Sequence, residues 1–129
     1  MANPNKRKGT AFESSVSRFV AAAIPGSVRV FRPPPMGRFD VGDVHIGGAV
    51  VLQCKDYGTW GKSLVSKWLS DVEVQAGHAG APLGVVVIKQ RREAGVSSGA
   101  ASDSVVVMSA GTFAEFLGVY FDGAPTVPE

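Results

Sequence analysis

Hydrophobic residues recur every three to four positions in two parts of the chain, which is the spacing of a helix with one apolar face. The first set predicts a helix over about 10–24, ended by Pro25-Gly26, and consists of Phe12, Val16, Phe19, Val20 and Ala23. The second helix follows a turn at Tyr57-Gly58, ends near Gly77–Gly80 and carries the apolar residues Leu64, Val65, Trp68, Leu69, Val72 and Ala76.

Shorter segments rich in β-branched residues predict strands. Ser27 to Phe31 is one, and it ends before the Pro33-Pro34-Pro35 run because proline cannot donate to a strand ladder. Segments 40–46 and 49–55 are joined by Gly47-Gly48, a pair that accepts the positive φ of a two-residue hairpin turn. These two segments are therefore expected to form a hairpin.

The C-terminal half of the chain contains two continuous apolar runs. Val85–Ile88 is too short for a helix and is typical of a strand buried on both faces, at the centre of a sheet. A second buried strand is expected at Val105–Met108, after a mobile Ser/Gly/Ala-rich loop over 91–103, with a short helix near 112–118 after it. The predicted order is α-β-β-β-α-β-β-α, which indicates an α/β fold with a mixed central sheet flanked by helices.

Length and composition indicate one domain. The 129 residues are 45% hydrophobic, and we expect a basic flexible arm over 1–9, a single domain over 10–121 and a disordered tail over 122–129. Cys54 is the only cysteine, which excludes disulfide scaffolds and zinc fingers. No stretch of the sequence has the apolar length of a signal peptide or a membrane span, so a cytoplasmic location is expected.

The net charge of +2 conceals an uneven distribution. Residues 1–38 contain seven Lys or Arg and one acid, whereas residues 39–129 contain six basic residues and ten acids. A basic end on a nearly neutral chain is typical of a protein that contacts a polyanion with one surface.

The polar residues best suited to bind a metal ion or to take part in catalysis are Glu13 in the first helix, Asp43 in the first hairpin strand, and Gln53 and Lys55 in the second. Because side chains alternate along a strand, Gln53 and Lys55 share one face, with Cys54 on the other. Oxygen ligands on neighbouring strands suit a hard divalent cation, and a lysine beside them can orient or deprotonate an attacking water.

These residues resemble the PD-(D/E)xK nuclease superfamily, and within it the archaeal-type and phage Holliday junction resolvases. Lys6-Arg7-Lys8-Gly9-Thr10-Ala11-Phe12-Glu13 is similar to the basic arm and Gly-Thr-x-Phe-Glu motif of the resolvases. Asp43 in Gly42-Asp43-Val44 resembles the motif aspartate, and Gln53-Cys54-Lys55 follows after an interval of nine residues, where the family has Glu-x-Lys. The predicted order of elements also matches the restriction-endonuclease-like α-β-β-β-α-β core.

Gln53 departs from the family pattern, because it keeps an oxygen ligand but removes one negative charge. The Mrr-like restriction nucleases are similar to this chain in carrying Gln-x-Lys. The resemblance implies that Mg²⁺, or Mn²⁺ in its place, is held by Glu13, Asp43, Gln53 and the Cys54 carbonyl, with Lys55 acting at the attacking water. It also implies a homodimer in a prokaryotic or phage-infected cell, since symmetric cuts across a four-way junction need two sites related by a two-fold axis.

Each of these residues also has a purely structural interpretation. Thr10 and Glu13 have the spacing of a helix capping box, and Asp40 competes with Asp43 as the aspartate ligand. Gln53 and Lys55 are compatible with an exposed strand end. We expect Cys54 to be an inert core thiol, Trp68 to be core, and His45 to be half-buried rather than catalytic.

Basic side chains are the expected contacts to DNA phosphates, which position a duplex without reading its bases. These are Lys6, Arg7, Lys8, Arg29, Arg32, Arg38, Lys62, Lys89, Arg91 and Arg92. The sequence therefore predicts a metal-dependent endodeoxyribonuclease that resolves branched DNA. The alternatives are an Mrr-like nuclease acting on linear or modified duplex, and a DNA-binding protein that has kept the fold without cleavage.

Overall fold

The computed structural model of the chain describes residues 4–34 and 37–122. Its helices and strands follow the predicted order α-β-β-β-α-β-β-α. The helices are α1 (Pro4–Ala23), α2 (Lys62–Ala79) and α3 (Ala110–Tyr120), with short 3₁₀ turns η1 (Gly37–Phe39) and η2 (Ala101–Asp103). The strands are β1 (Val30–Phe31), β2 (Val44–Ile46), β3 (Val50–Lys55), β4 (Leu83–Ile88) and β5 (Val105–Val107).

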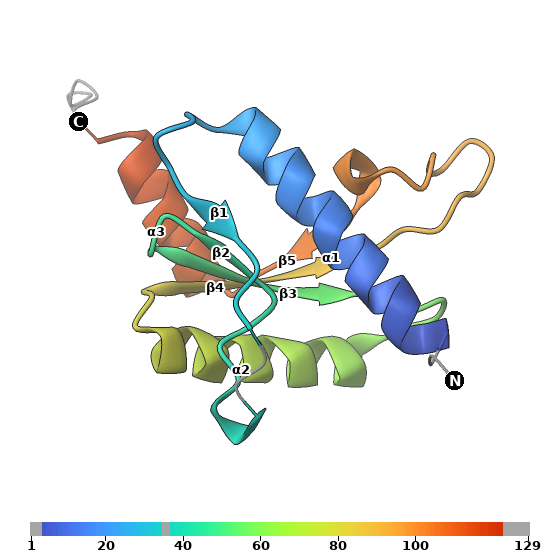
Figure 1. Cartoon of the computed structure of the whole chain (residues 1–129), viewed down its shortest axis with the longest axis horizontal. Helices are drawn as coiled ribbons and strands as arrows, with labels where there is room; N and C mark the ends of the chain where they lie inside the picture. The colour runs from blue at the N-terminus through green and yellow to red at the C-terminus, as the bar shows by residue number, and fades with distance from the viewer. Residues whose placement is uncertain (1–3, 35–36, 123–129) are drawn as a thin grey trace, which may run out of the picture.

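The five strands form one mixed sheet in the order β1-β2-β3-β4-β5 (Figure 1). Only β3 and β4 run parallel, and α2 makes the crossover between them; every other neighbouring pair is antiparallel. The predicted β2–β3 hairpin is confirmed, and Gly47 and Gly48 have φ angles of 59° and 71° in its turn. The α/β class with a mixed sheet flanked by helices is thus confirmed.

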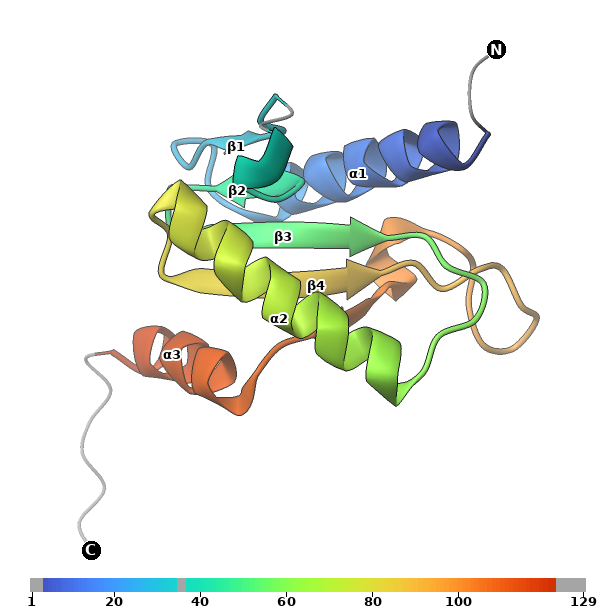
Figure 2. The same ribbon diagram turned by 90° about the horizontal axis from the view of Figure 1, so that it is seen from below.

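The core has two layers, one on each face of the sheet (Figure 2). On one face α1 contributes Phe12 and Val16, which pack against Val44, Leu52 and the neighbouring apolar residues of β4. On the other face α2 contributes its apolar stripe, the buried residues Trp68, Val72 and Ala76, which pack on Val51, Val86 and Ile88. The alternation of side chains along β3 and β4 therefore supplies both layers.

The boundaries of several elements differ from those predicted. The first helix begins at Pro4 rather than near Thr10, so residues 4–9 are helical instead of forming a flexible arm. Proline is favourable in the first turn of a helix because its missing N–H needs no partner there. Residues 1–3 of the expected arm and 123–129 of the expected tail lie outside the described residues.

Three strand predictions also need correction. β1 covers only Val30–Phe31 of the expected 27–31, and β2 begins at Val44 rather than at 40. The chain before Val44 is not extended, because the Asp40 side chain accepts the Gly42 N–H and Gly42 has a φ of 89°. β5 is an edge strand rather than a buried one: its middle residue, Val106, is 52% exposed. The expected mobile loop over 91–103 contains a bridge between Glu93 and Ser97 and the turn η2.

No helix within residues 4–34 and 37–122 is long and apolar enough to cross a membrane.

Candidate functional site

Three carboxylates line a cavity at the edge of the sheet where β2 begins. Glu13 comes from α1, and Asp40 and Asp43 come from the segment between η1 and β2. The cavity has a volume of about 550 Å³ and is lined by Gly9, Thr10, Glu13, Arg32, Pro33, Pro34, Gly37, Asp40, Gly42 and Asp43. Over the described residues, no group of three or more His, Cys, Asp and Glu side chains is close enough to hold a metal ion by itself.

Asp43 is fixed against the edge of β3. Its backbone N–H donates to the Leu52 carbonyl at 2.9 Å, and its Oδ2 accepts the backbone N–H of Cys54 at 2.8 Å. Burial raises the pKa of Asp43 to about 6, and the charges of Glu13 and Asp40 add to this effect, against the Cys54 hydrogen bond and the charge of Lys55. A carboxylate in this setting gains stability when a cation approaches it.

Asp40 is engaged in structural contacts. Its Oδ1 accepts the Gly42 N–H at 2.9 Å and its Oδ2 accepts Nε2 of Gln75, on α2, at 3.0 Å. Its backbone carbonyl also lies 3.0 Å from His78 Nδ1. Because both carboxylate oxygens of Asp40 already have partners, Asp43 is the better placed of the two aspartates to bind a ligand.

Glu13 is paired with Arg32. Nη2 of Arg32 lies 2.7 Å from Glu13 Oε2, and Nη1 of the same guanidinium donates to Ser14 Oγ at 2.7 Å. The capping-box interpretation of Thr10 and Glu13 is wrong, because α1 begins at Pro4 and both residues lie inside the helix. Glu13 is therefore free of a capping function, and its partner is a side chain that itself lines the cavity.

Gln53 and Lys55 share the α2 face of β3, as their alternation predicts. Lys55 Nζ lies 5.5 Å from the ring centroid of the buried Trp68, and neither Gln53 nor Lys55 lines the cavity that contains Glu13 and Asp43. The structure thus brings Glu13 and Asp43 together in one cavity. It places Gln53 and Lys55 outside that cavity, on the α2 face of β3.

Asp43 is the link between these two pairs. Val44 is the partner of Leu52, so extending the antiparallel register by one residue places Asp43 opposite Gln53. The charge of Lys55 also acts on the pKa of Asp43. Gln53 is only 6% exposed, and its Oε1 has no hydrogen-bond partner within the described part of the chain. An unsatisfied buried amide oxygen beside a partly buried carboxylate fits an oxygen-ligated divalent cation.

The Cys54 side chain lies on the α1 face of β3, as alternation predicts. Its thiol packs with the α1-side core, and burial raises the pKa of that thiol well above its usual range, so it is not a reactive nucleophile. Its backbone N–H donates to Asp43, and the N–H and C=O of one strand residue point to the same side. The Cys54 carbonyl is therefore directed toward the edge where Asp43 lies.

The basic residues predicted to contact DNA fall into separate groups. Lys6, Arg7 and Lys8 lie on the first turns of α1 and Arg38 lies in η1; nothing is described of these four side chains. The Arg29 guanidinium stacks on the Phe31 ring at 4.1 Å, and Arg32 is held by Glu13. Arg32 is thus a structural neighbour of the carboxylates as well as a candidate phosphate contact.

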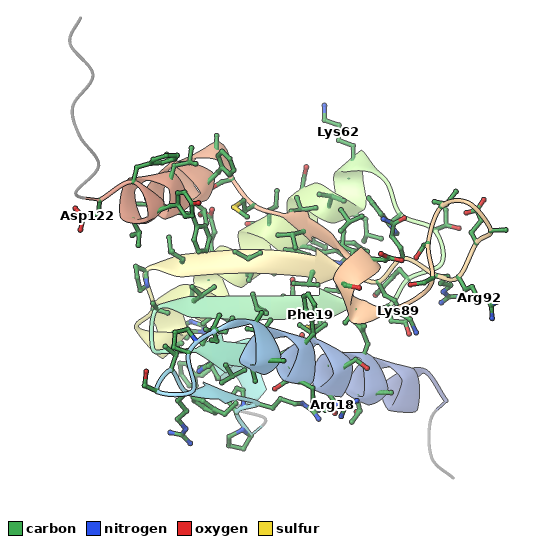
Figure 3. All side chains as sticks on the ribbon, turned by 90° about the horizontal axis from the view of Figure 1, so that it is seen from above. Arg18, Phe19, Lys62, Lys89, Arg92 and Asp122 are labelled. Carbon is green, nitrogen blue, oxygen red and sulfur yellow. The ribbon has the colours of Figure 1, made fainter. Side chains whose placement is uncertain are left out.

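A second basic group lies at the carboxyl ends of β3 and β4 (Figure 3). Lys89, Arg91 and Arg92 line a cavity of about 310 Å³ together with Asp56 and Gly99, and Lys62 is exposed at the start of α2. Arg91 Nη2 lies 3.6 Å from Oδ1 of the buried Asp56. This end of the sheet keeps an excess of positive charge that faces solvent.

Sequence reasoning missed Gln75 and Asp56. Gln75 is buried on α2 and ties Asp40 to that helix. Its signal was a polar residue between Val72 and Ala76 on the apolar stripe of the helix. Asp56 had no such signal, because its partner Arg91 lies far from it in the sequence.

The chain matches no protein-family model, no curated protein and no solved structure. The resemblance to the PD-(D/E)xK superfamily therefore stays a prediction based on the residues above.

Proposed function

We propose that this protein is a metal-dependent endodeoxyribonuclease that resolves branched DNA, as a Holliday junction resolvase does. The observation that carries the proposal is the Asp43 carboxylate, fixed to the β3 edge next to Glu13 in an open cavity, with its pKa raised to about 6. Such a carboxylate is costly to keep ionised, and perturbed groups of this kind concentrate at functional sites.

The residues present fit a hard cation. Asp43 and Glu13 supply carboxylate oxygens, Gln53 supplies a buried amide oxygen without a partner, and the Cys54 carbonyl points to the same edge. When bound, Mg²⁺ or Mn²⁺ supplies charge that stabilises the phosphate and acidifies a water. Lys55 lies over the Trp68 ring, outside the cavity, and its positive charge acts on Asp43 from the α2 side of β3. The resemblance implies that this lysine orients the attacking water and offsets charge developing on the phosphate.

Arg32 forms an ion pair with Glu13. Its bond to Glu13 neutralises one of the three carboxylates of the cavity, so less repulsion acts between Glu13 and Asp43. A cation held by Glu13 would compete with this ion pair, and the Arg32 guanidinium would then be available to a phosphate oxygen.

The order and pairing of the elements also support the proposal. The first six elements run α-β-β-β-α-β, with an antiparallel β2–β3 hairpin and a parallel β3–β4 pair, which is the restriction-endonuclease-like order that the resemblance implies. The basic residues at the carboxyl ends of β3 and β4 suit contacts to DNA phosphates, which make binding salt-dependent.

The direct test is cleavage of a labelled four-way junction beside a linear duplex of the same sequences, in Mg²⁺, Mn²⁺ or EDTA. Paired symmetric nicks are expected in the junction alone, lost in EDTA and in Lys55→Ala. Lys67→Ala is the matched control, since Lys67 is an exposed lysine of α2 held by Asp71 at 2.8 Å. It is expected to cleave as the wild type does.

Two other outcomes lead to the alternatives. Gln53 in place of the family's acid favours an Mrr-like nuclease, and equal cutting of linear DNA would support that function instead. Among the described residues, no three His, Cys, Asp or Glu side chains are grouped closely enough to hold a metal ion. This observation favours a non-catalytic DNA-binding protein. Junction binding that survives Lys55→Ala, with no cleavage in either metal, would establish that function and refute the nuclease.

A further inference from the structure

Gln75 is a polar residue in the buried stripe of α2. The other buried residues of this helix are Trp68, Val72 and Ala76, and Gln75 is only 6% exposed. A buried amide costs free energy unless its donors and acceptors are paired, and Oε1 of Gln75 has no hydrogen-bond partner among the described residues. Leucine would fill this position at a lower cost, so packing alone does not explain the amide.

The amide nitrogen of Gln75 is bonded to Asp40. Its Nε2 donates to Asp40 Oδ2 at 3.0 Å, and because a carboxylate only accepts, this contact fixes which end of the amide faces Asp40. The other oxygen, Oδ1, accepts the Gly42 N–H at 2.9 Å, which closes a turn between residues 40 and 42. One carboxylate thus joins α2 to the backbone immediately before Asp43.

His78 holds the same segment one turn further along α2. Its Nδ1 lies 3.0 Å from the Asp40 carbonyl oxygen, and its ring meets the Phe39 ring edge-on with 5.9 Å between the centroids. η1 and the residue after it therefore lie against the C-terminal part of α2 (Figure 2). The segment that leads into Asp43 is thus fixed by the helix on the opposite face of the sheet from α1.

The turn at 40–42 leaves little freedom to Asp43. Gly42 has a φ of +89°, and it lies so close to β3 that an added Cβ would strike that strand. The next residue, Asp43, donates its N–H to the Leu52 carbonyl and accepts the Cys54 N–H through Oδ2. A displacement of the turn would move the Asp43 backbone, and with it the carboxylate, away from the edge of β3.

We propose that Gln75 is a positioning residue, which through Asp40 and the turn at 40–42 places the Asp43 carboxylate in the candidate cation site. The same bond holds Asp40 Oδ2 on α2 although Asp40 also lines the cavity, so a cation is left to Asp43 and Glu13. Placement of Asp43 by Gln75 is independent of the proposed function, and only its effect on a cation rests on that function.

Amide hydrogen exchange, followed by NMR in EDTA, measures the placement of Asp43 without a metal. In Gln75→Leu, which keeps the apolar bulk and removes the donor, the Asp43 and Cys54 amides are expected to exchange at least about tenfold faster than in the wild type. The Val85 amide, in the parallel β3–β4 pair, should keep its wild-type rate because the core stays filled. Ser70→Leu places the same side chain at an exposed position of α2 and is the matched control, with wild-type exchange at all three amides.

A pair with donor and acceptor exchanged provides the rescue. Gln75→Glu would set two carboxylates against each other, and it is expected to speed exchange at Asp43 and Cys54 further. Adding Asp40→Asn restores the hydrogen bond, keeps an oxygen for the Gly42 N–H and returns the net charge to that of the wild type. The double variant should therefore exchange within about threefold of the wild type. Calorimetric titration with Mn²⁺ should follow the same order, with an affinity about tenfold lower in Gln75→Leu, as is typical when a residue that orients a metal ligand is removed.

The exchange rates decide the outcome. Wild-type exchange at Asp43 and Cys54 in Gln75→Leu would overturn the proposal, as would a double variant that exchanges as fast as Gln75→Glu. Faster exchange at Val85 in Gln75→Leu would assign Gln75 to the core instead, which also overturns it. A wild type that binds no Mn²⁺ but shows the expected exchange would refute the cation site of the proposed function and leave the placement of Asp43 by Gln75 established.

Discussion

Replacing Asp43 by asparagine should make the folded protein more stable while it abolishes cleavage. The carboxylate of Asp43 is partly buried and lies near Glu13 and Asp40, and its pKa is raised from 3.8 to about 6. The ionised form is therefore less favourable in the folded chain than in the unfolded one. Asparagine keeps an oxygen that can accept the Cys54 N–H, and it removes the charge.

The size of the effect follows from the pKa shift. Each pKa unit corresponds to about 1.4 kcal/mol, so the shift from 3.8 to about 6 corresponds to about 3 kcal/mol of destabilisation at neutral pH. The sign follows from linkage. Between these two pH values the unfolded chain has lost the Asp43 proton and the folded chain still holds it, so the free energy of unfolding decreases as the pH rises. Below that window Asp43 is neutral in both states and contributes no penalty.

The assay is urea unfolding of the wild type and Asp43→Asn at a series of pH values from below 4 to 7, in EDTA. The variant is expected to match the wild type at the acid end and to exceed its unfolding free energy by about 3 kcal/mol at pH 7. Glu73→Gln, which removes an exposed carboxylate of α2, is the control and should show no such growing difference.

A constant difference between wild type and Asp43→Asn across the whole pH series would refute this reasoning. It would mean that the substitution acts through packing or through the Cys54 hydrogen bond. A variant less stable than the wild type at pH 7 would refute it too, because the carboxylate would then be stabilising in the absence of a cation.

Three further predictions concern backbone approach and the Glu13 ion pair. Gly42→Ala should lower the unfolding free energy by at least about 2 kcal/mol, since this residue has a φ of +89° and an added Cβ would strike β3; the urea midpoint measures it. Gly84→Ala would place a Cβ 2.7 Å from the Val72 carbonyl oxygen of α2, so the unfolding free energy is expected to fall by about 1–3 kcal/mol. By contrast, Gly48 has a positive φ but open space around it, so Gly48→Ala should cost only its backbone strain. Arg32→Gln should leave Glu13 without its cationic partner and so raise Mn²⁺ affinity while weakening junction binding; an unchanged Mn²⁺ titration curve by calorimetry would contradict the competition between Arg32 and the cation.

The sequence by itself determined the elements and their order. Apolar spacing located α1 and α2, the run Val85–Ile88 identified the central strand β4, and Gly47-Gly48 set the β2–β3 turn. Alternation along β3 also predicted that Gln53 and Lys55 share a face, although only the fold shows that Trp68 lies over Lys55 on that face. These features are local, because side-chain periodicity and turn conformation depend on a few consecutive residues.

The tertiary structure decided which polar residues meet. No spacing in the sequence indicates that Arg32 pairs with Glu13, that Gln75 holds Asp40, or that Asp43 is fixed by the N–H of Cys54, since each contact joins segments distant in the chain. The same holds for the start of α1 and for the exposed apolar residues of α3. Whether an apolar residue is buried depends on what the rest of the fold places over it, and nothing in the described chain covers Tyr120.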